Sequence, residues 1–234
     1  MNKGPGLVNE VSAGNEAKTG EGSAPLPLSV YMITLNNGLT IEKALQSVAG
    51  WADEIVVVDS HSTDGAIDII QRYADKLYQF DTTSQQEKYQ YAQDQCRNQW
   101  VLFIDADEWL TADIKEEIKN IVLDGTDCNG FIVDRRNIYL GREIRYGGWY
   151  PDREIRLYRK DKGGWQGGIH AKVHVEGKVG HLRHSYMHTP YSDTAHQIRT
   201  VDRYSAAYAS DMLSSNRHFH LINMIARPIY RFFR

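Results

Sequence analysis

The stretch "VVVDSHSTDG", Val56–Gly65, carries the strongest indication of the protein's architecture. With Ile55 it forms a near-continuous apolar run, which is typical of a strand buried on both faces of a parallel sheet. The run ends at Asp59, and Asp64 follows five residues later. Ligands of such sheets bind outside the carboxyl ends of the strands. We therefore predict a buried strand that ends at a ligand site, although a turn at Asp59 and a helix N-cap at Asp64 would explain the pattern alone.

The surrounding sequence alternates strands with helices. Apolar runs predict strands at residues 28–34, 54–58, 76–80 and 100–104, and helical spacing predicts helices at 40–49, 64–74, 84–97 and 111–123. This alternation with short connections predicts an α/β fold with a mostly parallel sheet flanked by helices. In the second half we expect a smaller mixed β region, with strands at 130–140, 153–159 and 169–175, and a helix at 192–213 with Ser192 as its N-cap.

Composition limits the class of protein. The chain has 234 residues, of which 41% are hydrophobic, which suits one globular domain. A net charge of -3 gives no argument for nucleic-acid binding. Two isolated cysteines, Cys96 and Cys128, argue against a disulfide framework and for a reducing compartment. No apolar run is long enough to span a bilayer, and residues 1–24 have the polar composition of a disordered tail.

A second acidic motif follows the strand "WVLFI". Asp105 and Asp107 lie in "DADE" directly after this strand, and in an extended segment residues i and i+2 point the same way. Two hard carboxylates favour Mg²⁺ or Mn²⁺ over zinc. A solvated acidic turn before a helix is the alternative, and it explains Glu108 better than the two aspartates.

Four motifs follow one another along the chain: "LSVYMITLNN", "WADEIVVVDSHSTDG", "WVLFIDADEWL" and "YLGREIRYGGWYPDREIRLYRK". In this order they resemble the family 2 inverting glycosyltransferases of the GT-A fold, in particular the lipopolysaccharide-core β-glucosyltransferases and related bacterial envelope sugar transferases. The similarity covers residues 28–208. It implies transfer of a sugar, such as the hexose glucose, from a UDP-sugar to a glycan or lipid-linked acceptor, with Mg²⁺ or Mn²⁺ as cofactor.

The resemblance also implies roles for individual residues. Asp59 and Asp64 would bind the uridine of the nucleotide sugar, and Thr34 and Asn36 would line the base pocket. Asp105 would lie near the ribose and the metal, and Asp107 would be the principal metal ligand. His188 is the late histidine that would join the metal shell, although a lone histidine is more often structural.

The chain departs from the family pattern at two places. Relatives often carry Lys-Asn-Glu after the first strand, where this chain has Leu35, Asn36 and Asn37. Relatives also commonly carry His-Glu where this chain has His170-Ala171, so a candidate catalytic base is missing.

The segment "GGWYPD", residues 147–152, is the best remaining region for a base. Paired glycines allow close approach to a ligand, Trp149 can stack on a sugar face, and Asp152 is the predicted base. A β-turn with core aromatics fits equally well. Glu176, in an expected hairpin tip, is a weaker candidate.

Arg156 lies in the strand "REIRLYR", and we predict that its guanidinium contacts the phosphate or the acceptor. A solvated strand face is the alternative reading of this segment.

We expect three regions along the chain: a disordered tail at 1–24, one GT-A-like domain at 25–216, and a tail at 217–234. Within the domain, residues 25–125 form the nucleotide-sugar half and 126–216 the acceptor half. The last region interleaves arginines with aromatic residues, which suits peripheral contact with an anionic membrane at its cytoplasmic face. A helix docked on the domain is the alternative, and Pro228 is expected to interrupt any long helix.

Two other functions compete with an active transferase. A catalytically silent nucleotide-sugar-binding protein would explain Ala171. A nucleotidyltransferase would need a basic glycine-rich loop after the first strand, and "TLNNGLT" has one glycine and no Lys or Arg.

Overall fold

The structure is a computed structural model that describes residues 8–11, 24–82, 84–146, 148–167, 171–191, 193–214 and 220–233. The chain divides into two compact units, one of residues 1–135 and 153–188 and the other of residues 136–152 and 189–234. This division differs from the expected boundary at residue 126, because strands from the second half of the sequence extend the sheet of the first unit.

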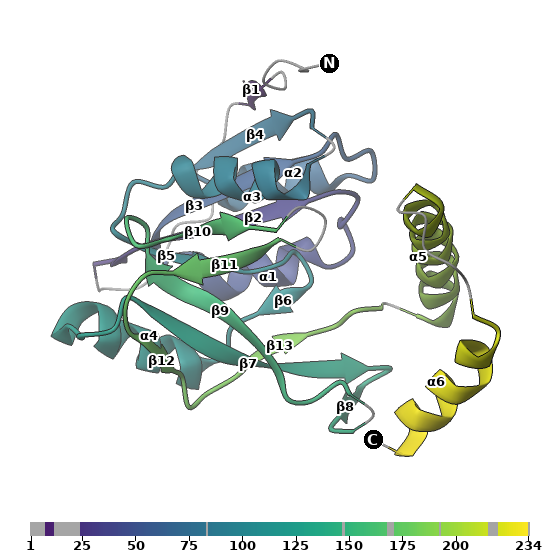
Figure 1. Cartoon of the computed structure of the whole chain (residues 1–234). Helices are drawn as coiled ribbons and strands as arrows, with labels where there is room; N and C mark the ends of the chain where they lie inside the picture. Colours follow the sequence, from purple (N-terminus) through teal and green to yellow (C-terminus); the bar gives the residue numbers. More distant parts are fainter. Residues whose placement is uncertain are drawn as a thin grey trace. The chain divides into compact units, whose positions relative to one another are not determined.

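Four parallel strands form the centre of the first unit, in the order β4-β3-β2-β5 (Figure 1). They are β2 (Leu26–Thr34), β3 (Ala52–Asp59), β4 (Lys76–Phe80) and β5 (Trp100–Phe103). These are the four strands predicted from the apolar runs. Thr34 pairs with Asp59, so two of the predicted site residues end adjacent strands at the carboxyl edge of the sheet.

Further strands widen this sheet on both sides. β9 (Asp152–Arg159) pairs antiparallel with β5, and the order continues through β7 (Gly130–Tyr139) and β13 (Tyr186–His188) to β6 (Glu108–Trp109). β12 (Val179–His181) pairs in parallel with β7. The pairing of β13 with β6 sets His188 opposite Glu108, which brings a distant histidine to the acidic motif.

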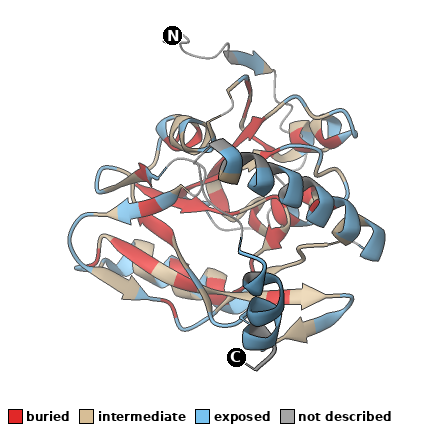
Figure 2. Cartoon of the chain, turned by 45° about the vertical axis from the view of Figure 1, so that its right-hand side comes forward, coloured by how far each residue is buried: buried red, intermediate tan, exposed pale blue. Residues whose placement is uncertain are grey.

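Both faces of the central strands are covered. One face packs against α1 (Ile41–Val48), α2 (Ala66–Tyr73) and α4 (Ala112–Asp124) through an aliphatic core. The other face packs against α3 (Gln85–Asp94) and the hairpin of β10 (Gly163–Gln166) and β11 (Lys172–Val175), with aromatic residues between them. The buried residues accordingly concentrate in the central strands (Figure 2).

The second unit contains the end of β7, β8 (Arg142–Ile144), α5 (Thr194–Ser214) and α6 (Ile222–Phe233). The Asp193 side chain accepts a hydrogen bond from the amide of His196 at 2.7 Å and caps α5, whereas the predicted cap, Ser192, lies outside the described residues. Pro228 lies inside α6 and does not end it, contrary to expectation. Within the described ranges, no helix has the length and apolar content needed to cross a membrane.

Two local expectations differ from the structure. In the segment expected to be a disordered tail, Val8–Val11 form β1, which pairs antiparallel with β4 at the edge of the sheet. β4 offers an edge for main-chain hydrogen bonds, which favours pairing even for a strand of four residues. Glu176 is not at a hairpin tip, because β11 pairs with β10 and β12 pairs with β7.

Candidate active site

The loops after β2 and β3 are joined by hydrogen bonds at the carboxyl edge of the sheet. The Asp59 carboxylate accepts hydrogen bonds from the Ser62 amide at 2.8 Å and the Ser62 hydroxyl at 2.5 Å. The Ser62 hydroxyl in turn accepts a hydrogen bond from the Asn36 amide at 2.8 Å. The Asn36 side-chain oxygen accepts from the Thr63 amide at 2.9 Å. Three predicted site residues (Thr34, Asn36 and Asp59) therefore belong to one ordered loop pair.

Asp64 joins the same two loops, and Gly65 rather than Asp64 is the N-cap of α2. Asp64 Oδ2 accepts a hydrogen bond from the Gly38 amide at 2.7 Å, and Asp64 Oδ1 accepts from the Ala66 amide at 3.2 Å. A Cβ at position 38 would lie 2.9 Å from the Asp64 carbonyl oxygen, so the loop needs glycine there. Gly38 is not among the residues predicted from sequence, although a glycine in a short polar loop after a buried strand was the available signal.

The acidic motif after β5 is a tight turn rather than an extended segment. The Glu108 amide donates to the Asp105 carbonyl at 3.0 Å, and a Glu108 carboxylate oxygen accepts from the Asp105 amide at 2.9 Å. The solvated role that the sequence suggested for Glu108 is wrong, because this side chain is fully buried. The turn brings Asp105, Asp107 and Glu108 together at the end of one strand.

Arg156 carries the positive charge under this turn. Its Nη2 lies 3.1 Å from Asp105 Oδ2, 2.9 Å from Glu108 Oε1 and 2.8 Å from Glu154 Oε2. The residue is 1% exposed, so the alternative of a solvated strand face is wrong. The predicted contact of Arg156 with a phosphate stays a prediction, and the guanidinium already has carboxylate partners.

Charge and burial shift the pKa values of this cluster. Burial and the neighbouring Glu108 raise the pKa of the Asp105 carboxyl to about 7, against the opposing effect of Arg156. Burial lowers the pKa of Arg156, but the charge of Glu108 and the other surrounding acidic groups outweigh burial and raise it well above its usual range. A cation bound beside Asp105 would favour its charged form and would lower this raised pKa.

Asp107 and His188 form a close pair at the acidic turn. Asp107 Oδ2 lies 3.3 Å from His188 Nε2, and both side chains are largely buried. A carboxylate oxygen and an imidazole nitrogen suit Mn²⁺, and the oxygen suits Mg²⁺. Among the described residues, no three His, Cys, Asp or Glu side chains form a complete metal site. An ion held here would need oxygen atoms from substrate phosphates or water.

Helix α3 adds aromatic and basic groups that the sequence analysis missed. The ring of Tyr89 stacks on Trp165 with centroids 3.9 Å apart, and Phe103 meets both rings edge-on. Burial and the charge of Asp105 raise the pKa of the Tyr89 hydroxyl, so it stays protonated. Burial lowers the pKa of Lys88, while Asp81 and Asp59 oppose this shift. These residues lie on the helix predicted at 84–97, where the pattern indicated only an element of the fold.

Trp149 and Asp152 belong to the second unit. The Trp149 carbonyl accepts a hydrogen bond from the Asn137 side chain at 2.8 Å, and its ring centroid lies 6.0 Å from that of Tyr139. Asp152 is partly exposed at the first position of β9. His170 and Gly147 lie outside the described residues, and Ala171 packs partly against the aromatic core.

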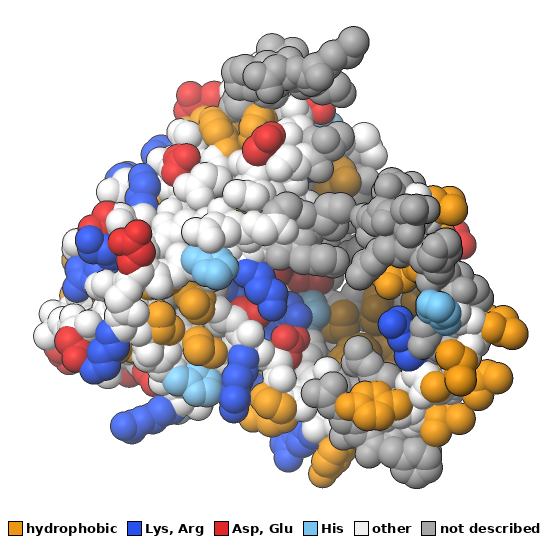
Figure 3. Space-filling view, in the orientation of Figure 1, with side chains coloured by type: hydrophobic (Ala, Val, Ile, Leu, Met, Phe, Trp, Pro, Cys, Tyr) orange, Lys and Arg blue, Asp and Glu red, His pale blue; other side chains and the backbone are white. Residues whose placement is uncertain are grey.

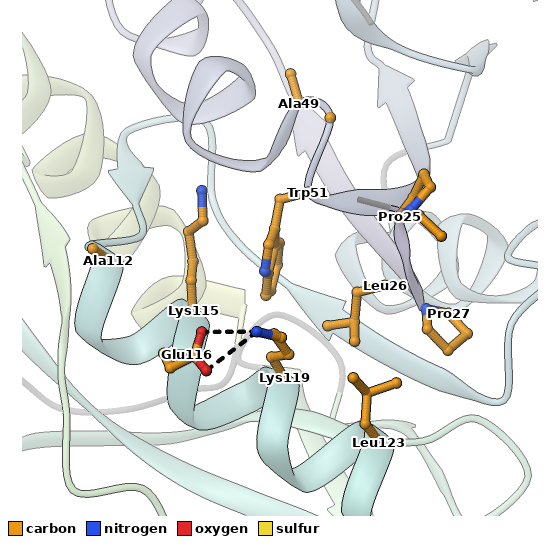
Figure 4. A pocket seen from close by; sticks show the side chains of 12 residues that line it. Pro25, Leu26, Pro27, Ala49, Trp51, Ala112, Lys115, Glu116, Lys119 and Leu123 are labelled. Atoms are coloured by element: carbon orange, nitrogen blue, oxygen red, sulfur yellow. Dashed lines mark hydrogen bonds and ion pairs between the residues drawn. The ribbon is translucent and has the colours of Figure 1, made fainter. Parts of the chain in front are cut away.

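A pocket of about 760 Å³ lies at the amino end of β2, the end away from Asp59 (Figure 4). Its lining includes Trp51, Leu26 and Leu123, with Lys115 and Lys119 beside them. None of the predicted site residues lines it.

Comparison with known proteins gives the family. The model of glycosyl transferase family 2 matches residues 29–173. The lipopolysaccharide core biosynthesis glycosyltransferase LpsC of Rhizobium meliloti (strain 1021) is 31% identical over 220 residues, which cover 89% of this chain and 80% of LpsC. An uncharacterized glycosyltransferase of Rickettsia bellii (strain RML369-C) is 25% identical over 219 residues, which cover 88% of this chain and 74% of that protein.

A solved structure supports the fold. Residues 1–349 of S. aureus TarS in complex with UDP superpose with a TM-score of 0.52 at 18% identity, over 70% of this chain and 60% of that chain. The same TarS segment in complex with UDP-GlcNAc gives a TM-score of 0.51 at 19% identity, over 71% of this chain and 59% of that chain. The chain belongs to glycosyl transferase family 2, and its mixed α/β architecture is the GT-A fold.

Proposed function

We propose that the protein is a metal-dependent inverting glycosyltransferase that moves a sugar, such as glucose, from a UDP-sugar to a glycan or lipid-linked acceptor. The observation that carries this proposal is the Asp105–Glu108 turn, in which Asp107 faces His188 at 3.3 Å at the end of a central strand. The loop around Asp59 follows β3, which lies two strands away from β5 in the same sheet. A nucleotide and its diphosphate can be held along such an edge.

The donor would be held by residues of the first unit. Asp59 and Asp64 keep the two loops together and, with Thr34 and Asn36, supply oxygen and amide groups for uridine. TarS, which shares the fold, was crystallised with UDP and with UDP-GlcNAc, and this supports a UDP-sugar as the first donor to test.

Asp107 and His188 are the proposed metal ligands, and Asp105 completes the acidic side of the site. When bound, Mg²⁺ or Mn²⁺ supplies positive charge that neutralises the departing diphosphate. The chain's own part is to hold these side chains at the sheet edge and to exclude water from the partly buried turn.

Inverting transfer also needs a group that accepts the proton of the acceptor hydroxyl as its oxygen attacks the anomeric carbon. We assign this role to Asp152, which ends the "GGWYPD" segment beside Trp149. Asp152→Asn should lower the transfer rate on the order of 10²–10⁴-fold, the usual effect of losing a positioned base. Ala171→Glu should leave the rate unchanged or lower it.

The experiment that tests the function starts with donor binding and ends with transfer. Thermal shift with UDP-, GDP- and dTDP-sugars, with and without Mn²⁺, identifies the donor, because a bound ligand raises the melting temperature by mass action. Transfer from the selected radiolabelled donor is then measured, and NMR of the product gives its anomeric configuration. A product that retains the donor configuration would contradict the inverting mechanism.

A catalytically silent nucleotide-sugar-binding protein is the second candidate, and Ala171 in place of the family's glutamate favours it. Donor binding without transfer to any acceptor would support this candidate. An increase in transfer by Ala171→Glu, with no effect of Asp152→Asn, would show that position 171 carries the base in this family.

The proposed acceptor rests on the similarity to LpsC and on the exposed apolar side chains of α6. LpsC is named as an enzyme of lipopolysaccharide core biosynthesis, and we extend this role in bacterial envelope polysaccharide or lipopolysaccharide synthesis to the present chain. Large apolar side chains on α6 are exposed, among them Ile222, Ile225 and Ile229 (Figure 3). An amphipathic helix with arginines suits the surface of an anionic membrane, and we place the enzyme peripherally on the cytoplasmic face.

A further inference from the structure

Arg156 and its carboxylate partners Asp105, Glu108 and Glu154 form a charged cluster at the acidic turn. A gain in stability does not explain why this cluster is buried. Arg156 is the largest fully buried side chain of the described chain, and its Nη1 is buried without a hydrogen-bond partner. Buried ion pairs are often no more stabilising than well-packed apolar residues, and an unsatisfied buried donor costs further free energy. The cluster therefore needs another physical role.

The contacts of Arg156 converge on the first aspartate of the turn. Its Nη2 donates hydrogen bonds to Asp105 at 3.1 Å and to Glu108 at 2.9 Å. Its Nε donates to the Tyr186 hydroxyl at 3.1 Å, and the guanidinium lies over the Phe103 ring at 4.6 Å. The guanidinium is thus held on its edge and on its face, and it fixes the position of the Asp105 carboxylate.

Glu108 holds the main chain of the same residue. One carboxylate oxygen accepts from the Asp105 amide, and the other is shared by Arg156 and by Arg135 at 3.1 Å. Asp105 is therefore fixed at its amide, its carbonyl and its carboxylate by two fully buried partners.

We propose that Arg156 and Glu108 are positioning residues, which hold Asp105 in the geometry that binds a nucleoside diphosphate with a divalent ion. This inference rests on the proposed function. Partners of this kind, which contact ligating groups and not the ion, typically change affinity by about 10–100-fold when they are replaced.

The test measures the Kd of UDP in the presence of Mn²⁺ by isothermal titration, on the full chain. Arg156→Lys keeps the charge but loses the planar fork, so Kd should rise by about tenfold or more. In the background of Asp105→Asn, the same change should alter Kd by less than about twofold, because Arg156 acts through the Asp105 carboxylate. Arg153→Lys is the control, since Arg153 is exposed on the same strand and pairs with Asp134. Circular dichroism checks that each variant is folded.

Glu108→Gln is a second variant, and its effect on Kd is likewise measured in the native protein and in the background of Asp105→Asn. A folded Arg156→Lys or Glu108→Gln protein with unchanged Kd would overturn the proposal, and so would an equal effect in both backgrounds. Loss of folding in both variants would assign the cluster to the core and also overturn it. Native protein that does not bind UDP with Mn²⁺ would instead refute the proposed function, and this inference with it.

Discussion

At the scale of single residues, the proposed role of Asp107 as the principal metal ligand can be tested directly. Asp107→Asn keeps the size of the side chain but removes the charge beside His188. We expect the melting temperature to stay close to that of the native protein, whereas the effect of Mn²⁺ on UDP affinity is lost. Isothermal titration of UDP with and without Mn²⁺ measures this. Unchanged Mn²⁺ dependence would contradict the assignment of Asp107 as a ligand.

Glu54 gives a second residue-scale prediction, which concerns stability and pH. It is fully buried, accepts hydrogen bonds from Ser29 at 2.5 Å and the Arg97 amide at 2.7 Å, and pairs with Lys76 at 2.9 Å. Burial raises the pKa of Glu54, but these partners lower it more, so its pKa in the fold is below the ordinary 4.5. Its contribution to stability is therefore full above pH 4.5 and is lost as pH falls through the lower folded value.

Glu54→Gln should lower the free energy of unfolding by about 2 kcal/mol at pH 7, the usual size for a hydrogen-bonded charge. This difference from the native protein should shrink as pH falls below 4.5. Urea denaturation at pH 7, 5 and 4 measures it. Glu116→Gln is the control, because the exposed pair of Glu116 with Lys119 should contribute little. An equal difference at all three pH values would contradict the explanation.

Residue positions were predictable from sequence where a side chain follows directly from its strand. Asp59 and Asp105 come straight after buried apolar runs, so their place at the sheet edge follows from the pattern alone. The partners of Arg156 do not, because Glu108 is 48 positions away and meets it only through the pairing of β9 in the sheet. The alternation in "REIRLYR" gave no indication that the arginine faces a charged cluster inside the protein.

At the scale of elements, the two loops at the sheet edge form one structural feature. A Cβ added at Gly38 would lie 2.9 Å from the Asp64 carbonyl oxygen and 3.1 Å from Asp64 Oδ2, so there is no room for it. Gly38→Ala should push the loops apart, break the hydrogen bond to Asp64, and weaken UDP binding by about tenfold, which corresponds to 1.4 kcal/mol. Isothermal titration checks this. Gly164→Ala is the control, since its Cβ would meet only the flexible end of Gln90 at 3.3 Å. Equal UDP affinity of both variants would contradict the coupling of the loops.

Long periodic elements were predictable, and short paired ones were not. The four central strands and α1, α2 and α4 follow from continuous or helical apolar patterns that local sequence contains. The strands β1, β6, β12 and β13 are only two to four residues long, so their existence depends on partners elsewhere in the chain. The position of His188 beside Asp107 results from one of these short pairings.

At the scale of the whole molecule, the exposed apolar side chains of α6 underlie the proposed contact with a membrane. On α6, Ile225 is 66% exposed and Ile229 is 54% exposed, and no acidic residue follows Asp211 in the sequence. Apolar side chains would enter the headgroup region, while arginines would be attracted to anionic lipids. This arrangement would bring the transferase to a lipid-linked acceptor.

Ile225→Asp with Ile229→Asp should therefore reduce co-sedimentation with vesicles containing phosphatidylglycerol by about tenfold or more, because two charges replace buried apolar contacts. Transfer to an acceptor free in solution should change less than twofold. Leu123→Asp is the matched control, since Leu123 is 57% exposed on α4 and should not affect vesicle binding. Binding of the native protein should also weaken at high salt and on neutral phosphatidylcholine vesicles. Equal sedimentation of the native and double-variant proteins would show that α6 does not bind the membrane and would favour a helix that packs against protein.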